Sequence, residues 1–265
     1  KYIYLMLLPV VAYYLVFHYW PMYGAQIAFK DFSPGKGILG SPWAGFKHFK
    51  SFFNAYYFRR VVKNTVLLSL NLIIWGFPAP IILALLLNEV RNKYFKSIVQ
   101  TITYLPHFVS IVVISGMIID FLSRDGLVNT IISALGMEPI PFMIKPEWFR
   151  TIYVASDIWQ QIGWGSIIYL AALSNIDQEL YEACKIDGGG RWKQTTSITI
   201  PGIAPTIIIM LILRVGKIMN VGAEKVLLLY NSNTYETADI ISTFIYRSGL
   251  IEMNYSYSSA VGLFN

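Results

Sequence analysis

The sequence predicts an all-α polytopic membrane protein with about six transmembrane helices and a polar helical hairpin. The chain of 265 residues is 55% hydrophobic and only 14% charged, with a mean hydropathy of +0.51, whereas soluble chains carry roughly 25% charge. Uncharged runs reach the roughly 20 residues that cross a 30 Å hydrocarbon core. They cover 2–29, 64–88, 97–119 and 194–213. Any one run could be a core helix of a soluble protein, but so many in one chain favour a membrane.

We expect helices because lipid offers no partner to free backbone N–H and C=O groups, and no strand-length alternation suggests a barrel. They lie at roughly 2–22, 62–88, 98–121, 149–174 and 202–221, with a last one from about 256 past the end. Lys1 directly precedes an apolar run and Asn265 stops within another, so we expect both ends to be truncated. Residues 1–265 are read as a single transmembrane domain.

The segment 23–60 predicts an extracytoplasmic loop that contains an aromatic helix. Phe46, Phe49 and Phe53 recur at helical spacing, which places an aromatic stripe on one face. A helix lying at the membrane interface is one interpretation. A helix packed on the other spans is the alternative, and neither carries chemistry.

The charges of the chain do not form a nucleic-acid-binding patch. The net charge is +6, but the basic residues are scattered among loops, where membrane proteins place them. The lone Cys184 excludes an intrachain disulfide, and the first apolar run lacks a signal-peptide cleavage site. The short loops favour 88–96 and 175–200 inside the cell, but 23–60 is also basic. Charge alone therefore leaves the orientation open.

The polar segment 175–200 predicts a compact hairpin between two apolar runs. Ser174 and Asp177 are candidate N-caps of a first short helix. Gly188–Gly190 ends this helix, because glycine accepts the positive φ of a sharp reversal. A second helix leads to Pro201 at the entry of the next span. An ordinary amphipathic loop is the alternative.

The hairpin carries the sequence Glu182-Ala183-Cys184-Lys185-Ile186-Asp187-Gly188 and, after nine intervening residues, Ile198-Thr199-Ile200-Pro201. It resembles the Glu-Ala-Ala…Gly…Ile-x-Leu-Pro loop of importer permeases, the membrane subunits of binding-protein-dependent ABC transporters. Cys184 and Ile200 depart from that pattern. The likeness covers the whole chain and is greatest to permeases for oligosaccharides and polysaccharide fragments. It assigns ATPase coupling to Glu182, Ala183, Cys184, Asp187, Gly188, Ile198 and Pro201.

The resemblance implies a permease subunit of an ATP-driven importer in a bacterial plasma membrane, with both termini and the 175–200 loop cytoplasmic. The implied partners are a second, related permease chain, two ABC ATPase subunits, an extracytoplasmic solute-binding protein, membrane lipid and an oligosaccharide, which we expect to be acidic. The sequence contains no Gly-x-x-x-x-Gly-Lys-Ser/Thr, so we expect ATP and Mg²⁺ to bind only the partner ATPase. We expect no cofactor and no metal in this chain.

Ionisable side chains within the spans are costly and usually face a cavity or a partner. Asp157 lies in the fourth expected span, with Gln160, Gln161 and Trp164 at i+3, i+4 and i+7. Arg214 and Lys217 are one turn apart in the fifth. These six residues are candidates for the substrate path, where the two cations would attract sugar carboxylates. An internal Asp157–Arg214 ion pair and a snorkelling Lys217 are the alternatives.

Two other function classes compete with the importer. A membrane-embedded enzyme would need a catalytic arrangement, but the histidines are isolated and no His-Glu-x-x-His or Gly-x-Ser-x-Gly occurs, so we assign no catalytic residue. A channel without ATP coupling would not need the hairpin. The importer is the function that we predict.

Overall fold

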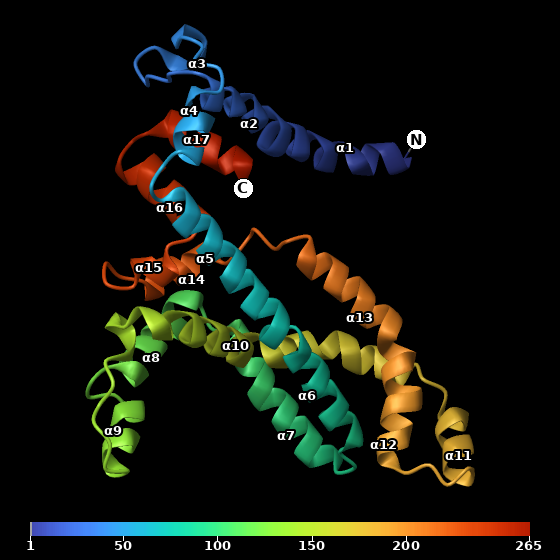
Figure 1. The fold of residues 1–265 in the computed structure, drawn as a ribbon. Coiled ribbons are helices and arrows are strands. Elements are labelled where there is room, and N and C mark those ends of the chain that lie inside the picture. Colours follow the sequence, from blue (N-terminus) through green and yellow to red (C-terminus); the bar gives the residue numbers. More distant parts are fainter. Residues whose placement is uncertain (1) are drawn as a thin grey trace. The chain divides into compact units, whose positions relative to one another are not determined.

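The structure is a computed structural model that describes residues 2–265, and its regular elements are helices joined by loops and turns (Figure 1). No β-strand forms within these residues; Lys30 and Trp43 make one isolated bridge. The helices fall into two compact units. The first unit contains residues 2–63 and 239–265, and the second contains residues 64–238. The predicted all-α fold class is confirmed.

The first unit begins with a long apolar helix. It also holds two short helices, the start of α5 and the C-terminal helices. Its elements are α1 (Tyr2–Tyr14), η1 (Leu15–Tyr19), α2 (Trp20–Met22), η2 (Tyr23–Phe29), α3 (Gly37–Gly40), α4 (Lys47–Phe53), α5 (Phe58–Asn71), α16 (Ile241–Tyr246), η7 (Arg247–Ile251) and α17 (Tyr255–Phe264). Residues 4–29 form a single 26-residue helix whose most apolar stretch has no buried residue. Side chains so exposed and apolar are suited to lipid.

Helix α4 packs inside the first unit. Phe52 is 1% exposed, and its ring lies 5.0 to 6.2 Å from those of Phe58, Phe244 and Phe264. Such aromatic contacts add to the burial of apolar area. Phe52 therefore agrees with the second interpretation of this helix, in which it packs on neighbouring helices.

The second unit holds the remaining helices. Its elements are the end of α5, η3 (Leu72–Gly76), α6 (Pro78–Glu89), α7 (Lys93–Tyr104), η4 (Leu105–Phe108), α8 (Ile111–Leu122), α9 (Leu127–Ala134), η5 (Phe142–Ile144), α10 (Pro146–Ser174), α11 (Gln178–Ile186), α12 (Arg191–Gln194), η6 (Thr195–Thr199), α13 (Ile200–Val215), α14 (Ala223–Leu229) and α15 (Tyr235–Ala238). The 29-residue α10 is central, with α6, α7 and α13 packed against it (Figure 1). Ala84, Tyr169, Leu173 and Ile203 form an apolar core between α6, α10 and α13.

Three helices within residues 2–265 are long and apolar enough to cross a membrane: Tyr4–Phe29, Phe58–Glu89 and Arg191–Val215. The predicted span at 98–121 is wrong as a single straight helix, because Lys93–Phe108 and Ile111–Ala134 meet at a bend of 104°. Pro106 ends α7 in a 3-10 turn, and the Ser110 hydroxyl caps α8 by accepting from the Val112 N–H at 3.3 Å. The count of about six spans also includes α10 and α17 and stays a prediction.

The fifth expected span, 202–221, is shorter in the structure. Helix α13 ends at Val215, and Gly216 is its C-cap. Lys217 therefore lies in the turn beyond the helix instead of one turn along it from Arg214. At its other end this helix is longer than predicted, since α12, η6 and α13 form one continuous helix, Arg191–Val215.

Candidate functional site

Two glycines of α10 decide how closely its neighbours approach. A side chain at Gly163 would collide with the backbone of Thr103 in α7, and one at Gly165 would press on the ring of Pro80 in α6 at 3.0 Å. Without side chains, both helices lie directly on α10. Residues from the end of η3, from α6, from α10 and from α13 surround one space.

A polar cavity of 340 Å³ opens at this place in the second unit. Helix α10 contributes Asp157, Gln161 and Trp164, whose i, i+4 and i+7 spacing puts them on one face. Arg214 of α13 lies across from them. The other lining residues are Gly76, Phe77, Pro80, Gly165, Tyr169 and Met210. Gln160, which we had placed on the same face, is buried at 5% exposure and does not line this cavity.

Asp157 and Arg214 form an ion pair at the edge of this cavity. The Arg214 Nη2 lies 3.9 Å from the Asp157 Oδ2, and the side chains are 44% and 22% exposed. A second cavity of 160 Å³ also contains both residues, together with Tyr153, Lys217 and Asn220. From the sequence, Asp157 and Arg214 could either line a cavity or pair with each other. In the structure they do both.

His107 supports two residues that line the 340 Å³ cavity, Gln161 and Trp164. Its ring stacks on Trp164 at 4.5 Å between centroids with an interplanar angle of 1°, and its Nδ1 lies 2.9 Å from the Gln161 Oε1. This stack and hydrogen bond hold the two α10 side chains in place. Sequence reasoning had treated His107 as an isolated residue near a helix end. Nothing in the sequence joins it to α10, because the contact depends on the bend after α7.

Lys225 is a second residue that the sequence reasoning missed. It lies in the apolar helix α14, is 4% exposed, and its ammonium is 5.2 Å from the centroid of the Tyr153 ring. Its Nζ has no hydrogen-bond partner among the described residues. A lone lysine between Glu224 and Val-Leu-Leu-Leu is a usable sequence signal, since an ionisable group in apolar surroundings needs a reason.

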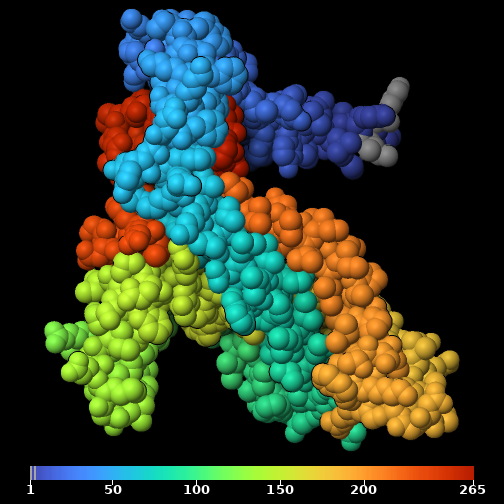
Figure 2. All heavy atoms as spheres, viewed as in Figure 1, coloured from blue at the N-terminus to red at the C-terminus, as the bar shows by residue number. Residues whose placement is uncertain are grey.

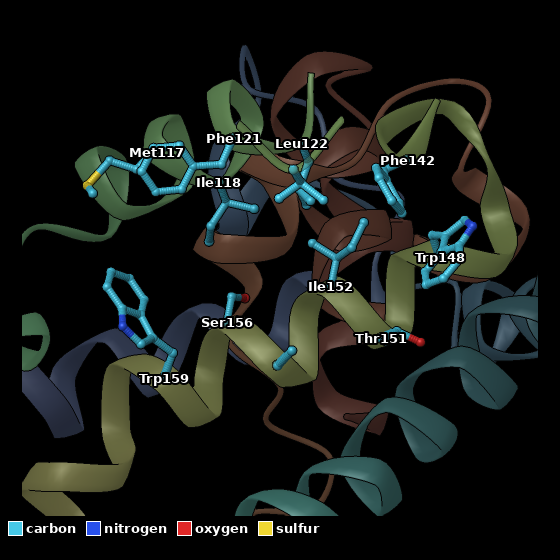
Figure 3. Close-up of a pocket in the computed structure, with 12 residues that line it drawn as sticks. Met117, Ile118, Phe121, Leu122, Phe142, Trp148, Thr151, Ile152, Ser156 and Trp159 are labelled. Carbon is cyan, nitrogen blue, oxygen red and sulfur yellow. The ribbon is translucent and has the colours of Figure 1, made fainter. Parts of the chain in front are cut away.

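A larger cavity of 510 Å³ lies on the opposite side of α10, toward α8 and η5 (Figure 3). Its lining includes Ile118, Phe142, Ile152 and Trp159 and no charged residue. Ile152 and Trp159 are about half a turn around the helix from Asp157. An apolar cavity of this kind offers little to a solute rich in hydroxyl groups, so the charged cavity is the better candidate site.

The hairpin has the helix–glycine–helix form that the sequence predicts. Asp177 caps α11, its Oδ1 accepting from the Glu179 N–H at 3.0 Å. At the other end Gly188 has φ +75°. The Gly188 N–H donates to the Lys185 carbonyl at 3.0 Å and the Gly189 N–H to the Cys184 carbonyl at 2.7 Å, which is a Schellman motif. Ser174 is no N-cap: it ends α10, and its hydroxyl donates to the Ala171 carbonyl.

Most of the predicted coupling residues are on the surface of the hairpin. Glu182, Ala183, Asp187, Gly188 and Pro201 are exposed, while Cys184 and Ile198 are half-buried. Figure 2 shows the hairpin atoms, in gold, uncovered at one end of the second unit.

Two large apolar side chains that the sequence reasoning passed over are also exposed there: Ile186 at 87% and Trp192 at 80%. The Tyr181 hydroxyl meets the Thr199 hydroxyl at 3.1 Å and ties the two arms together. Among residues 2–265, no group of three His, Cys, Asp or Glu side chains is arranged to hold a metal.

Long apolar helices, a charged cavity between them and a projecting polar hairpin define the class of membrane transport proteins. The sequence profile of the family described as binding-protein-dependent transport system inner membrane component matches residues 76–247. The chain belongs to this family. The predicted resemblance to importer permeases is thereby confirmed, and so is a place in the membrane.

Relatives and solved structures agree with this assignment. The chain is 48% identical, over 100% of its length and 83% of the relative, to the polygalacturonan/rhamnogalacturonan transport system permease protein YteP of Bacillus subtilis (strain 168). It is similar to a structure of a bacterial ABC transporter involved in the import of the acidic polysaccharide alginate, with a TM-score of 0.93 and 47% identity over 99% of this chain and 89% of the other. The bacterial alginate ABC transporter in complex with alginate pentasaccharide-bound periplasmic protein gives a TM-score of 0.92 and 46% identity, covering 99% and 88%.

Proposed function

We propose that this chain is a permease subunit of an ATP-driven importer that carries an acidic oligosaccharide or polysaccharide fragment across a bacterial plasma membrane. The observation that carries this proposal is the half-exposed Arg214 in a cavity that Trp164, itself stacked on His107, also lines. A guanidinium matches the geometry of a carboxylate, and an aromatic face suits the apolar face of a sugar ring. Polygalacturonan and alginate, named for the relatives, are both polymers of uronic acids.

The exposed surface of the hairpin supports a role in coupling. Ile186, Trp192 and Leu180 are uncovered apolar side chains of the hairpin, and such residues are typical anchors of a protein interface. The proposed occupant is the ABC ATPase, which would bind ATP and Mg²⁺ and move the hairpin when it closes. The residues that would contact the ATPase, or hold the contacting residues in place, are Glu182, Ala183, Cys184, Asp187, Gly188, Ile198 and Pro201.

The remaining partners follow from this role. A second permease chain would complete the path, two ATPase subunits would bind the two hairpins, and an extracytoplasmic binding protein would deliver the sugar. The family description itself names dependence on a binding protein. The hairpin would then lie in the cytoplasm, and 23–60 outside.

The test is uptake by the complete complex in proteoliposomes, with oligogalacturonides of defined length presented by the binding protein. We expect ATP-dependent accumulation that Arg214→Gln reduces, with less effect on the methyl-esterified, neutral oligosaccharide. Equal loss for acid and ester would contradict Arg214 as the carboxylate ligand. Transport of neutral oligosaccharides alone by the wild type would contradict the acidic substrate.

A further inference from the structure

The ion pair at the cavity edge is a loose one. At 3.9 Å, the Nη2–Oδ2 distance exceeds the 2.7–2.9 Å or so that a charge-assisted hydrogen bond takes. The Arg214 side chain is 44% exposed. Its guanidinium therefore keeps donors available to a second carboxylate in the cavity while Asp157 partly neutralises it.

A second cation lies close to the smaller cavity. The Lys225 ammonium lies over the ring of Tyr153, which lines the smaller cavity together with Asp157. Burial lowers the pKa of Lys225 to about 8, and the attraction of the Asp157 carboxylate opposes that change. The Lys225 Nζ makes no hydrogen bond within residues 2–265. All of its N–H donors are therefore available to the Asp157 carboxylate.

We propose that Asp157 is the internal counter-ion of Arg214, and that the carboxylate of an acidic sugar takes its place. In the empty cavity Asp157 neutralises the guanidinium. When a uronate enters, Arg214 binds the sugar carboxylate and Asp157 is held by Lys225. The inference rests on the proposed function, because it requires an acidic substrate.

Exchange of one carboxylate for another suits a transport path. A cation without any counter-ion in a partly buried site is costly, and it would also bind an acidic sugar too tightly to release it. Ligands on a conduction path must bind strongly enough to enter and weakly enough to leave. Asp157 competes with the sugar carboxylate for Arg214, which weakens sugar binding. When the sugar leaves, Asp157 pairs with Arg214 again, so the guanidinium is not left without a counter-ion.

The test measures sugar binding to the assembled complex, with binding protein and ATP present and with ATPase subunits that cannot hydrolyse ATP. The probes are an oligogalacturonide and its neutral methyl ester. We expect Asp157→Asn to tighten binding of the acid by roughly two- to fivefold, the contribution of a half-exposed ion pair, and to leave the ester unchanged. A fixed structural pair predicts instead that the variant weakens acid and ester alike.

Double variants show whether the gain passes through Arg214. Asp157→Asn should tighten acid binding in a Lys217→Gln background but not in an Arg214→Gln background. Lys217 is the matched control because it lines the smaller cavity yet forms no salt bridge within residues 2–265. A gain that persists without Arg214 would overturn the exchange.

Two further results separate the inference from the proposed function. Lys225→Met should weaken binding of the acid and spare the ester, because Asp157 then stays with Arg214; no change would overturn the role of Lys225. If the wild type binds the acid no better than the ester, the proposal of an acidic substrate is wrong, and the proposed counter-ion exchange is wrong as well. If the wild type prefers the acid but Asp157→Asn gives no gain, only the exchange falls.

Discussion

Gly188 is the residue whose replacement tests the coupling hairpin most directly. Its φ of +75° lies in the left-handed region, which costs an L-residue about 1–2 kcal/mol. If the backbone moved to avoid this strain, the hairpin would lose the two Schellman hydrogen bonds at 3.0 and 2.7 Å, each worth about 1 kcal/mol. Either way Gly188→Ala disfavours the observed hairpin by about 1–2 kcal/mol, or roughly 5- to 30-fold in population.

The assay is ATP hydrolysis by the reconstituted complex with and without sugar-loaded binding protein. We expect stimulation to fall in the order wild type, Gly188→Asn, Gly188→Ala, Gly188→Val. Asparagine accepts positive φ better than alanine, and a β-branched residue accepts it worst. Co-purification of the ATPase shows whether the hairpin still binds its partner.

Gly190 is the matched control for this series. It lies in the same loop with φ −74°, and no atom comes within 4 Å of a side chain placed there. Gly190→Ala should therefore leave stimulation near that of the wild type. Normal stimulation in Gly188→Val, or an equal loss in Gly190→Ala, would refute the reasoning from backbone conformation.

The remaining predictions concern stability, measured by thermal unfolding of the purified protein. Gly163→Ala should destabilise the second unit by about 1–3 kcal/mol because the added carbon overpacks the contact with α7, whereas Gly116→Ala, a helical site with open space, should be neutral or stabilising by up to about 1 kcal/mol; equal effects would contradict the close approach. Asp239→Asn should destabilise the first unit by on the order of 3 kcal/mol, because the 0%-exposed carboxylate pairs with two arginines at 3.0 and 2.8 Å; a neutral result would exclude that role. The hydrogen bond from Lys47 holds the pKa of Asp31 below its usual value, so this group stabilises above about pH 4 and ceases to do so as the pH falls through its lowered pKa. Asp31→Asn should abolish that acid-side dependence, and an unchanged pH profile would contradict it.

The sequence predicted most of the helices because each depends on local signals. The apolar runs, the Asp177 cap and the Gly188 reversal act within a few residues of one another, and α10 appeared close to its predicted bounds. The same local reasoning placed Asp157, Gln161 and Trp164 on one face. It failed where helices end or bend within apolar sequence, at Ser110 and after Val215.

The contacts that build the site are not local and could not be predicted from spacing. His107 reaches Trp164 only because the bend after α7 turns it toward α10 and Gly163 lets the two helices touch. Lys225 reaches the ring of Tyr153, a residue of α10, only after the turn that follows α13. The three-dimensional path of the chain, and not the composition of any segment, brings these residues together.

Arg214 and the hairpin lie near opposite ends of one helix, which links the two proposals. The 25-residue helix Arg191–Val215 starts in the hairpin, and at 1.5 Å per residue its ends are about 36 Å apart. Helix α10, which carries Asp157, stops at Ser174 before the hairpin begins. Only residues 175–177 separate the end of α10 from α11 of the hairpin, so displacement of the hairpin acts both on the helix that carries Arg214 and on the helix that carries Asp157.

We infer that ATPase closure changes the distance between α13 and α10 and thereby the hold of Arg214 on either carboxylate. Spin labels at the exposed Thr151 and Leu213, in a Cys184→Ala background that removes the native thiol, report this distance in the nucleotide-free and ATP-bound complex. A shift that Gly188→Val abolishes would tie the hairpin to the charge pair. Identical distances in both states would separate them, and the counter-ion exchange would then proceed without help from ATP.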